Sequence, residues 1–189
     1  MVGCYEAGKK DVPAMTSGKV TLHASVDRSG KTTCAVPSDD SGLTQDVEDC
    51  MRKRLERETY PPQDAAWSAV LPIVVDNGAL ALGQPNTKPM IDTIESHGLA
   101  EDIYDVVERM LPELKACLRT LDKSSDRRVV YVGAEVGKDG KVTCALASSP
   151  APIPESVREC ASSALAKATF KPPKRGAGLI SIPLDVAKK

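Results

Sequence analysis

The side chains best suited to chemistry in this 189-residue chain are six cysteines. No two of them form a CxxC pair, and the two histidines, His23 and His97, have no ligand-like neighbours in the sequence. A structural zinc site needs closely spaced ligands of these types, so we expect no metal site. Six cysteines in so short a chain instead indicate structural disulfides and an oxidising compartment. The cysteines are Cys4, Cys34, Cys50, Cys117, Cys144 and Cys160.

The remaining reactive side chains form no catalytic pattern. Neither histidine lies in a nucleophile–base motif, and no glycine-rich phosphate loop is present. Acidic residues gather at the start of a predicted helix, where the helix dipole favours negative charge, so we interpret them as structural and not as a calcium site. They are Asp39, Asp40, Asp46, Glu48 and Asp49. The sequence thus predicts a protein without enzymatic activity and without a cofactor.

The stretch 18–60 occurs twice, the second time 110 residues later. A repeat of this length indicates two copies of a domain and not a solenoid, whose periods are several-fold shorter. Each copy carries three cysteines, and the second and third are 16 residues apart in both. Domains of roughly 75 to 95 residues bury a small core, and with only 3 % aromatic residues the aliphatic side chains must fill it.

Each copy is predicted to begin with a helix followed by a β-hairpin. Alternation from Val20 to Val26 has the period of a half-buried strand, and a turn ending at Gly30 leads to a second strand. In that strand Thr32, Cys34 and Val36 are expected to share one apolar face.

A helix over 44–58 and a third strand at 67–75 should follow, with 178–186 as the equivalent strand of the second copy. Pro72 and Pro183 place these third strands at a sheet edge, or at least turn that nitrogen away from a neighbour. The fold class is therefore α+β, with two tandem α-β-β-α-β domains. Each domain is expected to have a three-stranded antiparallel sheet with two helices on one face.

The expected boundaries are 1–76 for the first domain, 77–99 for a linker and 100–189 for the second domain. The linker is rich in Gly, Asn and Pro, with a short helical segment predicted at Ile91 to His97. The helix before the second hairpin should kink or restart at Pro112. The helix before the first hairpin is expected to be truncated, because the chain begins just before Cys4, and we interpret the chain as an excised fragment.

The charge pattern argues against a nucleic-acid partner, and the length of the apolar runs argues against a membrane-spanning segment. The net charge is −1, and the longest basic cluster, Arg52-Lys53-Arg54, shares its helix with acidic residues, so no nucleic-acid surface is expected. No apolar run approaches the 18 residues or more of a membrane-spanning helix.

His23 points away from the face of Leu22, so it is expected to be either solvated or packed beneath the neighbouring domain.

Taken in order, these motifs resemble a known family. The CYE start, the GKV strand, the turn before Gly30-Lys31, the VEDC helix and the aromatic–proline exits (TYPP, TFKPP) are similar to the AgmX/PglI C-terminal domain family, related to the TonB and TolA C-terminal domains. The resemblance covers 4–75 and about 100–186, and the second copy departs from it by having Cys117-Leu118-Arg119 in place of CYE. It implies a TonB-like fold in a periplasmic or outer-membrane-associated protein of a Gram-negative bacterium, such as a lipoprotein or part of a motility or transport complex.

The resemblance also implies disulfides Cys4–Cys50 and Cys117–Cys160. The residues themselves leave an alternative open, Cys34–Cys50 and Cys144–Cys160, since strand and helix cysteines could both point into the core.

The expected function is a protein-interaction module that pairs an exposed strand edge with an envelope protein or peptide. A disulfide-stabilised scaffold and a small-ligand binder in the interdomain groove are the alternatives. Pairing of sheet edges between the two domains, or between two molecules in a homodimer, would close the binding edges.

Overall fold

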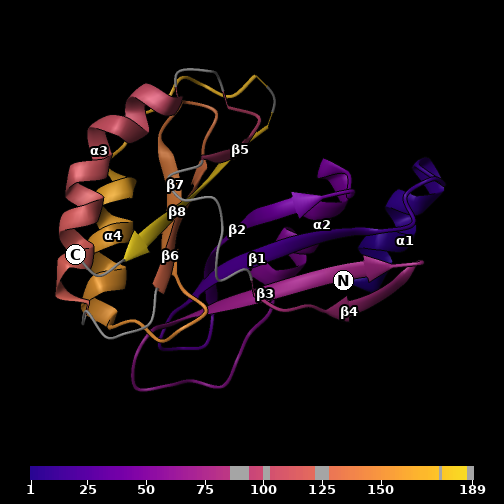
Figure 1. The fold of residues 1–189 in the computed structure, drawn as a ribbon, viewed down its shortest axis with the longest axis horizontal. Helices are drawn as coiled ribbons and strands as arrows, with labels where there is room; N and C mark the ends of the chain where they lie inside the picture. Colours follow the sequence, from indigo (N-terminus) through magenta and orange to yellow (C-terminus); the bar gives the residue numbers. More distant parts are fainter. Residues whose placement is uncertain (86–93, 100–102, 122–127, 175, 187–189) are drawn as a thin grey trace.

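The computed structural model describes residues 1–85, 94–99, 103–121, 128–174 and 176–186 (Figure 1). Within these residues the chain forms four α-helices and two antiparallel sheets of four strands each. The α+β class is confirmed, but the prediction of three strands per sheet is wrong because each sheet gains a short strand from the segment between the two repeats.

The first half contains α1 (Val2–Asp11), β1 (Gly18–Val26), β2 (Thr32–Ser41), α2 (Gln45–Glu56), β3 (Trp67–Asp76) and β4 (Ala79–Leu82). The second half contains β5 (Glu95–His97), α3 (Ile103–Cys117), β6 (Arg128–Val136), β7 (Val142–Ser148), α4 (Glu155–Ala166) and β8 (Gly178–Val186). A short 3₁₀ turn, Leu118–Thr120, follows α3. Helix α3 is continuous through Pro112, so of the predicted kink or restart the restart does not occur.

The two halves share one strand order, as the repeat predicts. The sheets run β2-β1-β3-β4 and β7-β6-β8-β5, so each strand of one repeat has its counterpart at the same place. Both hairpins carry the same irregularity, in which Val26 pairs with Thr32 while Ser25 pairs with Cys34. This bulge turns Thr32 to the helix-covered face, and the expectation that it shares a face with Cys34 is wrong.

The segment 77–99, predicted as a linker, supplies both additional strands. Asn77 and Gly78 have φ values of 48° and 83°, which suits a two-residue hairpin turn between β3 and β4. Of the predicted helical segment, residues 91–93 lie outside the described residues, and Glu95–His97 form β5 instead. Strand β5 pairs with β8, so the segment leaves the first sheet and enters the second.

Each sheet is covered on one face by the two helices of its own half (Figure 1). In the first half α1 and α2 lie on β1 through Tyr5, Met51 and Leu22. In the second half α3 and α4 lie on β6 through Leu114, Leu165 and Val132. The apolar stripes that the sequence places on these helices therefore form two separate cores.

The other faces of the sheets pack against each other. Figure 1 shows the strands of the first sheet running across those of the second, with β2 against β6 and β8 and with β7 against β1 and β3. Cys34, Val36 and Leu146 are buried between them. We call this face-to-face contact the seam. Because the sheets meet by faces, the expectation that the two domains pair edge to edge is wrong.

Candidate functional site

In each half one disulfide joins the two helices. Cys4 on α1 is bonded to Cys50 on α2, and Cys117 at the end of α3 is bonded to Cys160 on α4, with Cα atoms 5.6 Å apart in both pairs. These are the pairs that the family resemblance implied. The alternative strand-to-helix pairs do not form, because Cys34 and Cys144 lie on the sheet faces that point away from the helices.

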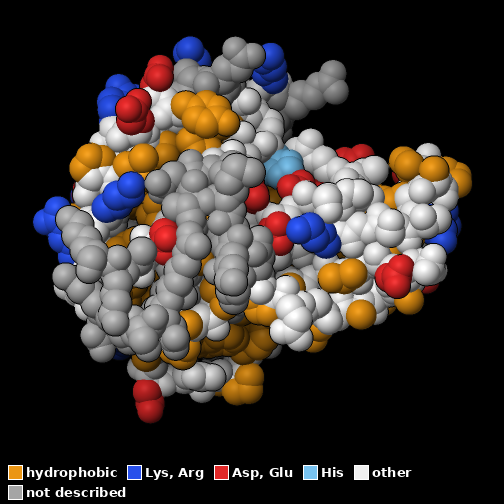
Figure 2. All heavy atoms as spheres, in the orientation of Figure 1, with side chains coloured by type: hydrophobic (Ala, Val, Ile, Leu, Met, Phe, Trp, Pro, Cys, Tyr) orange, Lys and Arg blue, Asp and Glu red, His pale blue; other side chains and the backbone are white. Residues whose placement is uncertain are grey.

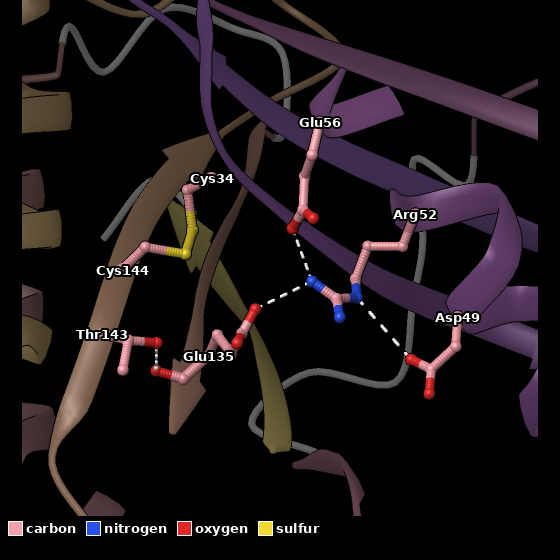
Figure 3. A network of polar contacts seen from close by, with 7 residues as sticks. All are labelled: Cys34, Asp49, Arg52, Glu56, Glu135, Thr143 and Cys144. Carbon is pink, nitrogen blue, oxygen red and sulfur yellow. Dashed lines mark hydrogen bonds and ion pairs between the residues drawn. A yellow bond between two sulfur atoms is a disulfide. The ribbon is translucent and has the colours of Figure 1, made fainter. Parts of the chain in front are cut away.

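The third disulfide joins the two sheets across the seam. Cys34 on β2 is bonded to Cys144 on β7, a sequence separation of 110 residues (Figure 3). The sequence reasoning did not consider this pair. A signal for it was present: once each repeat pairs two of its cysteines, one cysteine per copy is left over, and the two leftovers are equivalent.

His23 lies at the centre of the seam and is only 1 % exposed. Its Nδ1 and Nε2 atoms lie 2.7 Å and 2.6 Å from the hydroxyl oxygens of Ser148 and Ser38, one on each sheet. Its ring lies against that of Tyr131, with centroids 4.3 Å apart. Burial lowers the pKa of His23 to about 3, so the ring is neutral. Of the two environments expected for His23, the structure shows the packed one.

The contact between His23 and the two serines does not form a catalytic site. Ser38 and Ser148 are completely buried, so a substrate cannot reach either hydroxyl. Both imidazole nitrogens are also engaged by serine hydroxyls, which leaves no ring nitrogen for the carboxylate that orients histidine in a nucleophile–base–acid triad. The arrangement therefore connects the two halves instead of activating a nucleophile.

A second polar cluster lies where β5 meets the first half. Asp40 on β2, Glu48 on α2 and His97 on β5 each bring one oxygen or nitrogen atom within 4.8 Å of the others. The His97 Nε2 atom lies 3.5 Å from Asp40 Oδ2. Figure 2 shows acidic side chains beside a histidine where the halves meet. The sequence placed Asp40 and Glu48 in one acidic group, but it gave no sign that His97, on the distant strand β5, joins them.

The surroundings of this cluster are strongly acidic. Glu48 is 2 % exposed, and its burial, together with the charge of Asp40, raises its pKa to about 8. The neighbouring Glu95 carboxylate accepts a hydrogen bond of 2.6 Å from the backbone nitrogen of Asp39, and burial raises the pKa of Glu95 as well. The Lys19 Nζ atom lies 2.9 Å from Asp39 Oδ1. A set of two carboxylates and an imidazole in such a place could hold a divalent cation.

A buried arginine forms a third polar contact between the two halves (Figure 3). The Nη1 atom of Arg52 on α2 donates to Glu56 on the same helix and to Glu135 on β6, the latter at 2.8 Å. Its Nε atom lies 3.6 Å from Asp49. Arg52 is 4 % exposed, so the charge is held between the halves and away from solvent.

A hollow of about 600 Å³ lies beside helices α1 and α2 of the first half. It is lined by the Cys4–Cys50 pair and by charged side chains of α2 and the residues that follow it, among them Arg54 and Arg57. It is not placed between the domains, where the sequence reasoning had put a ligand groove. The seam itself is filled by buried side chains such as His23, Val36 and Leu146.

Part of β3 has an unpaired outer edge. Trp67–Asp76 pairs along most of its length with β1 on one side, but β4 covers only Ile73–Asp76 on the other. Among the described residues no strand pairs with the outer edge of 67–71, where the side chains are partly exposed. The equivalent strand β8 is buried over its first seven residues. Leu82, at the end of β4, is 74 % exposed.

Comparison with models of known protein families, with curated proteins and with solved structures finds no match to this chain. The resemblance to the AgmX/PglI C-terminal domain family therefore stays a prediction. None of the helices among the described residues is long and apolar enough to cross a membrane, as expected from the sequence.

Proposed function

We propose that this chain is a non-enzymatic protein-interaction module of the bacterial cell envelope, periplasmic or outer-membrane-associated, which binds an extended peptide of an envelope partner along the outer edge of β3. The observation that carries the proposal is the unpaired edge at 67–71, which continues the line of the short strand β4. Such an edge offers backbone hydrogen bonds to an added strand, and alternate side-chain positions give specificity. The three disulfides support an oxidising compartment.

The register of β3 identifies the groups that an added strand would contact. The Pro72 carbonyl accepts a hydrogen bond from the Gly83 N–H on the β4 side. Every second residue of a strand directs its N–H and C=O to the same side, so the residues two and four positions before Pro72 also direct these groups outward. These residues are Ser68 and Val70. Pro72 has no N–H to donate, so the β4 ladder ends there and the edge beyond it stays available.

The hairpin strands β2 and β7, which form the opposite edges of the two sheets, are less suitable. Residues 34–38 of β2 are buried in the structure, and Pro37 removes a donor from that strand. Residues 146–148 of β7 are buried as well. The flanks of the β3 edge are apolar and accessible by contrast, with Trp67 and Val70 partly exposed.

Replacing Val70 by proline tests the proposal. Val70→Pro removes an outward N–H but no hydrogen bond to β1, and Pro72 shows that this strand accepts proline at the same register. The matched control is Val70→Ala, which shortens the same side chain and keeps the N–H. Periplasmic extract and a displayed library of extended peptides are offered to all three proteins, and the expected result is binding by wild type and Val70→Ala only.

Hydrogen exchange adds a site-specific measurement. The amides of Ser68 and Val70 should exchange freely in the unbound chain and become protected when a selected peptide binds. Binding that is unchanged in Val70→Pro, or protection that appears elsewhere, would show that strand addition at this edge is wrong.

A structural scaffold is the second candidate function. The disulfide across the seam and the buried His23 favour it, because they fix the two halves as one unit. If the chain is a scaffold, no peptide should bind at the β3 edge. Substitution of exposed helix residues should then abolish binding of its partners.

A further inference from the structure

We propose that Asp40, Glu48 and His97 form a binding site for one divalent transition-metal ion of the Zn²⁺ class. The three ligand atoms lie within 4.8 Å of one another, and they come from β2, α2 and β5. The site is independent of the proposed strand edge, and its occupant would connect the first half to the strand that enters the second half.

The donor set fits such an ion. One imidazole with two carboxylates suits zinc and similar divalent metals, whereas calcium takes oxygen ligands only. Two ligands of a tetrahedral zinc at about 2.0–2.2 Å from the metal are about 3.4 Å apart. The distance of 3.5 Å between His97 Nε2 and Asp40 Oδ2 agrees with this value. A tetrahedral ion held by these three side chains would take water or another ligand in its fourth position.

Glu48 supplies a second and independent observation. Glu48 is only 2 % exposed, yet among the described residues no lysine, arginine or backbone N–H donates a hydrogen bond to its carboxylate. The nearby Lys19 and Asp39 N–H donate to Asp39 and Glu95 instead. The Asp40 carboxyl of the same cluster lies within hydrogen-bonding reach of the Glu48 carboxyl. Two carboxyl groups in contact need a proton or a cation between them. Because the His97 imidazole lies within 4.8 Å of both carboxylates, a metal ion is a fitting occupant.

The ion would fix β5 in place. Strand β5 has three residues and pairs with Leu179–Ser181 of β8 on one side. On its other side Glu95 accepts from the Asp39 backbone nitrogen and His97 faces Asp40. A metal bound by His97 and the two acidic residues would join β5 to β2 and α2 more firmly than these two contacts alone.

Titration of the chelator-treated full chain with Zn²⁺ tests the site. The expected result is one equivalent bound, with a shift of the His97 imidazole signals in the NMR spectrum. His23 is the internal control: it is buried between two serines and its signals should keep their shifts. The chain has no third histidine, so His97→Gln assigns the two sets of signals without ambiguity.

Carboxylate variants complete the test. Glu48→Gln and Asp40→Asn should each weaken Zn²⁺ binding at least tenfold, whereas Asp46→Asn, on the first turn of the same helix, should leave it unchanged. Circular dichroism and retained disulfides establish that the variants are folded. The proposal is overturned if wild type binds no equivalent, which leaves a shared proton between the carboxyls, or if bound Zn²⁺ shifts no His97 signal.

Discussion

Cys34 and Cys144 occupy the same position in the two copies of the repeat, and they are bonded to each other. In a two-fold symmetric contact, residues on the axis meet their own equivalents. Val36 and its counterpart Leu146 likewise pack together. Ser38 and its counterpart Ser148 come together on one side chain, because each contacts a ring nitrogen of His23. The two halves of this chain therefore associate as the subunits of a symmetric dimer do, within one polypeptide.

Removal of the seam disulfide should lower stability substantially. Because Cys34 and Cys144 close a loop of 110 residues, the double variant Cys34→Ser with Cys144→Ser should lose about 2–4 kcal/mol of unfolding free energy. Guanidinium unfolding measures the loss. The comparison is Cys117→Ser with Cys160→Ser, whose shorter loop lies within one half. An unchanged midpoint in the Cys34 and Cys144 double variant would mean that packing alone holds the seam.

His23 should make stability depend on pH. Burial holds its pKa at about 3 in the folded chain, against 6.5 when unfolded. Between these values the unfolded chain binds a proton that the folded chain does not, so the contribution is complete above pH 6.5 and falls by up to about 1.4 kcal/mol per pH unit below it. Tyr131, the ring beside it, stays protonated throughout, because burial raises its pKa.

The variant His23→Gln isolates this effect. Glutamine can donate to one serine and accept from the other, but it does not titrate. The unfolding free energy is measured at pH 7 and at pH 4.5. Its decrease between these two pH values should be smaller in the variant than in wild type by about 2–3 kcal/mol. His97→Gln serves as the control for loss of a histidine outside the seam. Equal pH slopes in wild type and His23→Gln would contradict the assignment.

Gly133 is the counterpart of His23 in the second repeat, and its lack of a side chain makes room for the seam. A Cβ atom at this position would lie 3.1 Å from Val36 Cγ1 and 3.1 Å from the Ile180 carbonyl oxygen. Gly133→Ala should therefore destabilise by about 1–2 kcal/mol, and Gly133→Val by more. Gly3→Ala is the control. Gly3 lies in helix α1, and an added Cβ atom would be 3.9 Å from Arg54 Nη1, so stability should rise by about 0.5–1 kcal/mol. Thermal unfolding compares the three variants.

The repeat and the hydrophobic periodicity predicted most of each domain. Alternation in β1 and the apolar stripe of α2 are local patterns, and both were placed correctly. The fourth strands were missed because Asn77-Gly78 was interpreted as a linker turn, although such a pair between short apolar runs is typical of a hairpin. For β5 no such local signal exists, since three residues fix no periodicity.

The candidate sites depend on contacts that sequence spacing does not reveal. Asp40, Glu48 and His97 meet only because β5 crosses to the first half before it joins the second sheet. His23 was correctly placed opposite Leu22, but its serine partners lie on different sheets. The pairing of Cys34 with Cys144 is not contained in the pattern of one domain, and only a comparison of the two copies, which leaves one equivalent cysteine in each, points to it.

Arg52 should stabilise the contact between the two halves through Glu135. Arg52→Met keeps the length of the buried side chain but leaves the carboxylates of Glu56 and Glu135 without their shared cation. The full cost of breaking a buried ion pair is about 3–5 kcal/mol, and since these carboxylates are partly exposed we expect about 2 kcal/mol. Lys53→Met, on the neighbouring exposed position, should change stability by less than about 0.5 kcal/mol.

A double-mutant cycle with Glu135→Gln separates the seam contact from the contacts within α2. Because Arg52 bonds Glu135 at 2.8 Å across the two halves, the coupling free energy between them should be about 1–2 kcal/mol and should change little with added salt. The equivalent cycle with Glu56→Gln measures the contact on the same helix. If all the coupling of Arg52 is with Glu56, the arginine stabilises its own helix, and the seam is held by the disulfide and the buried side chains around His23.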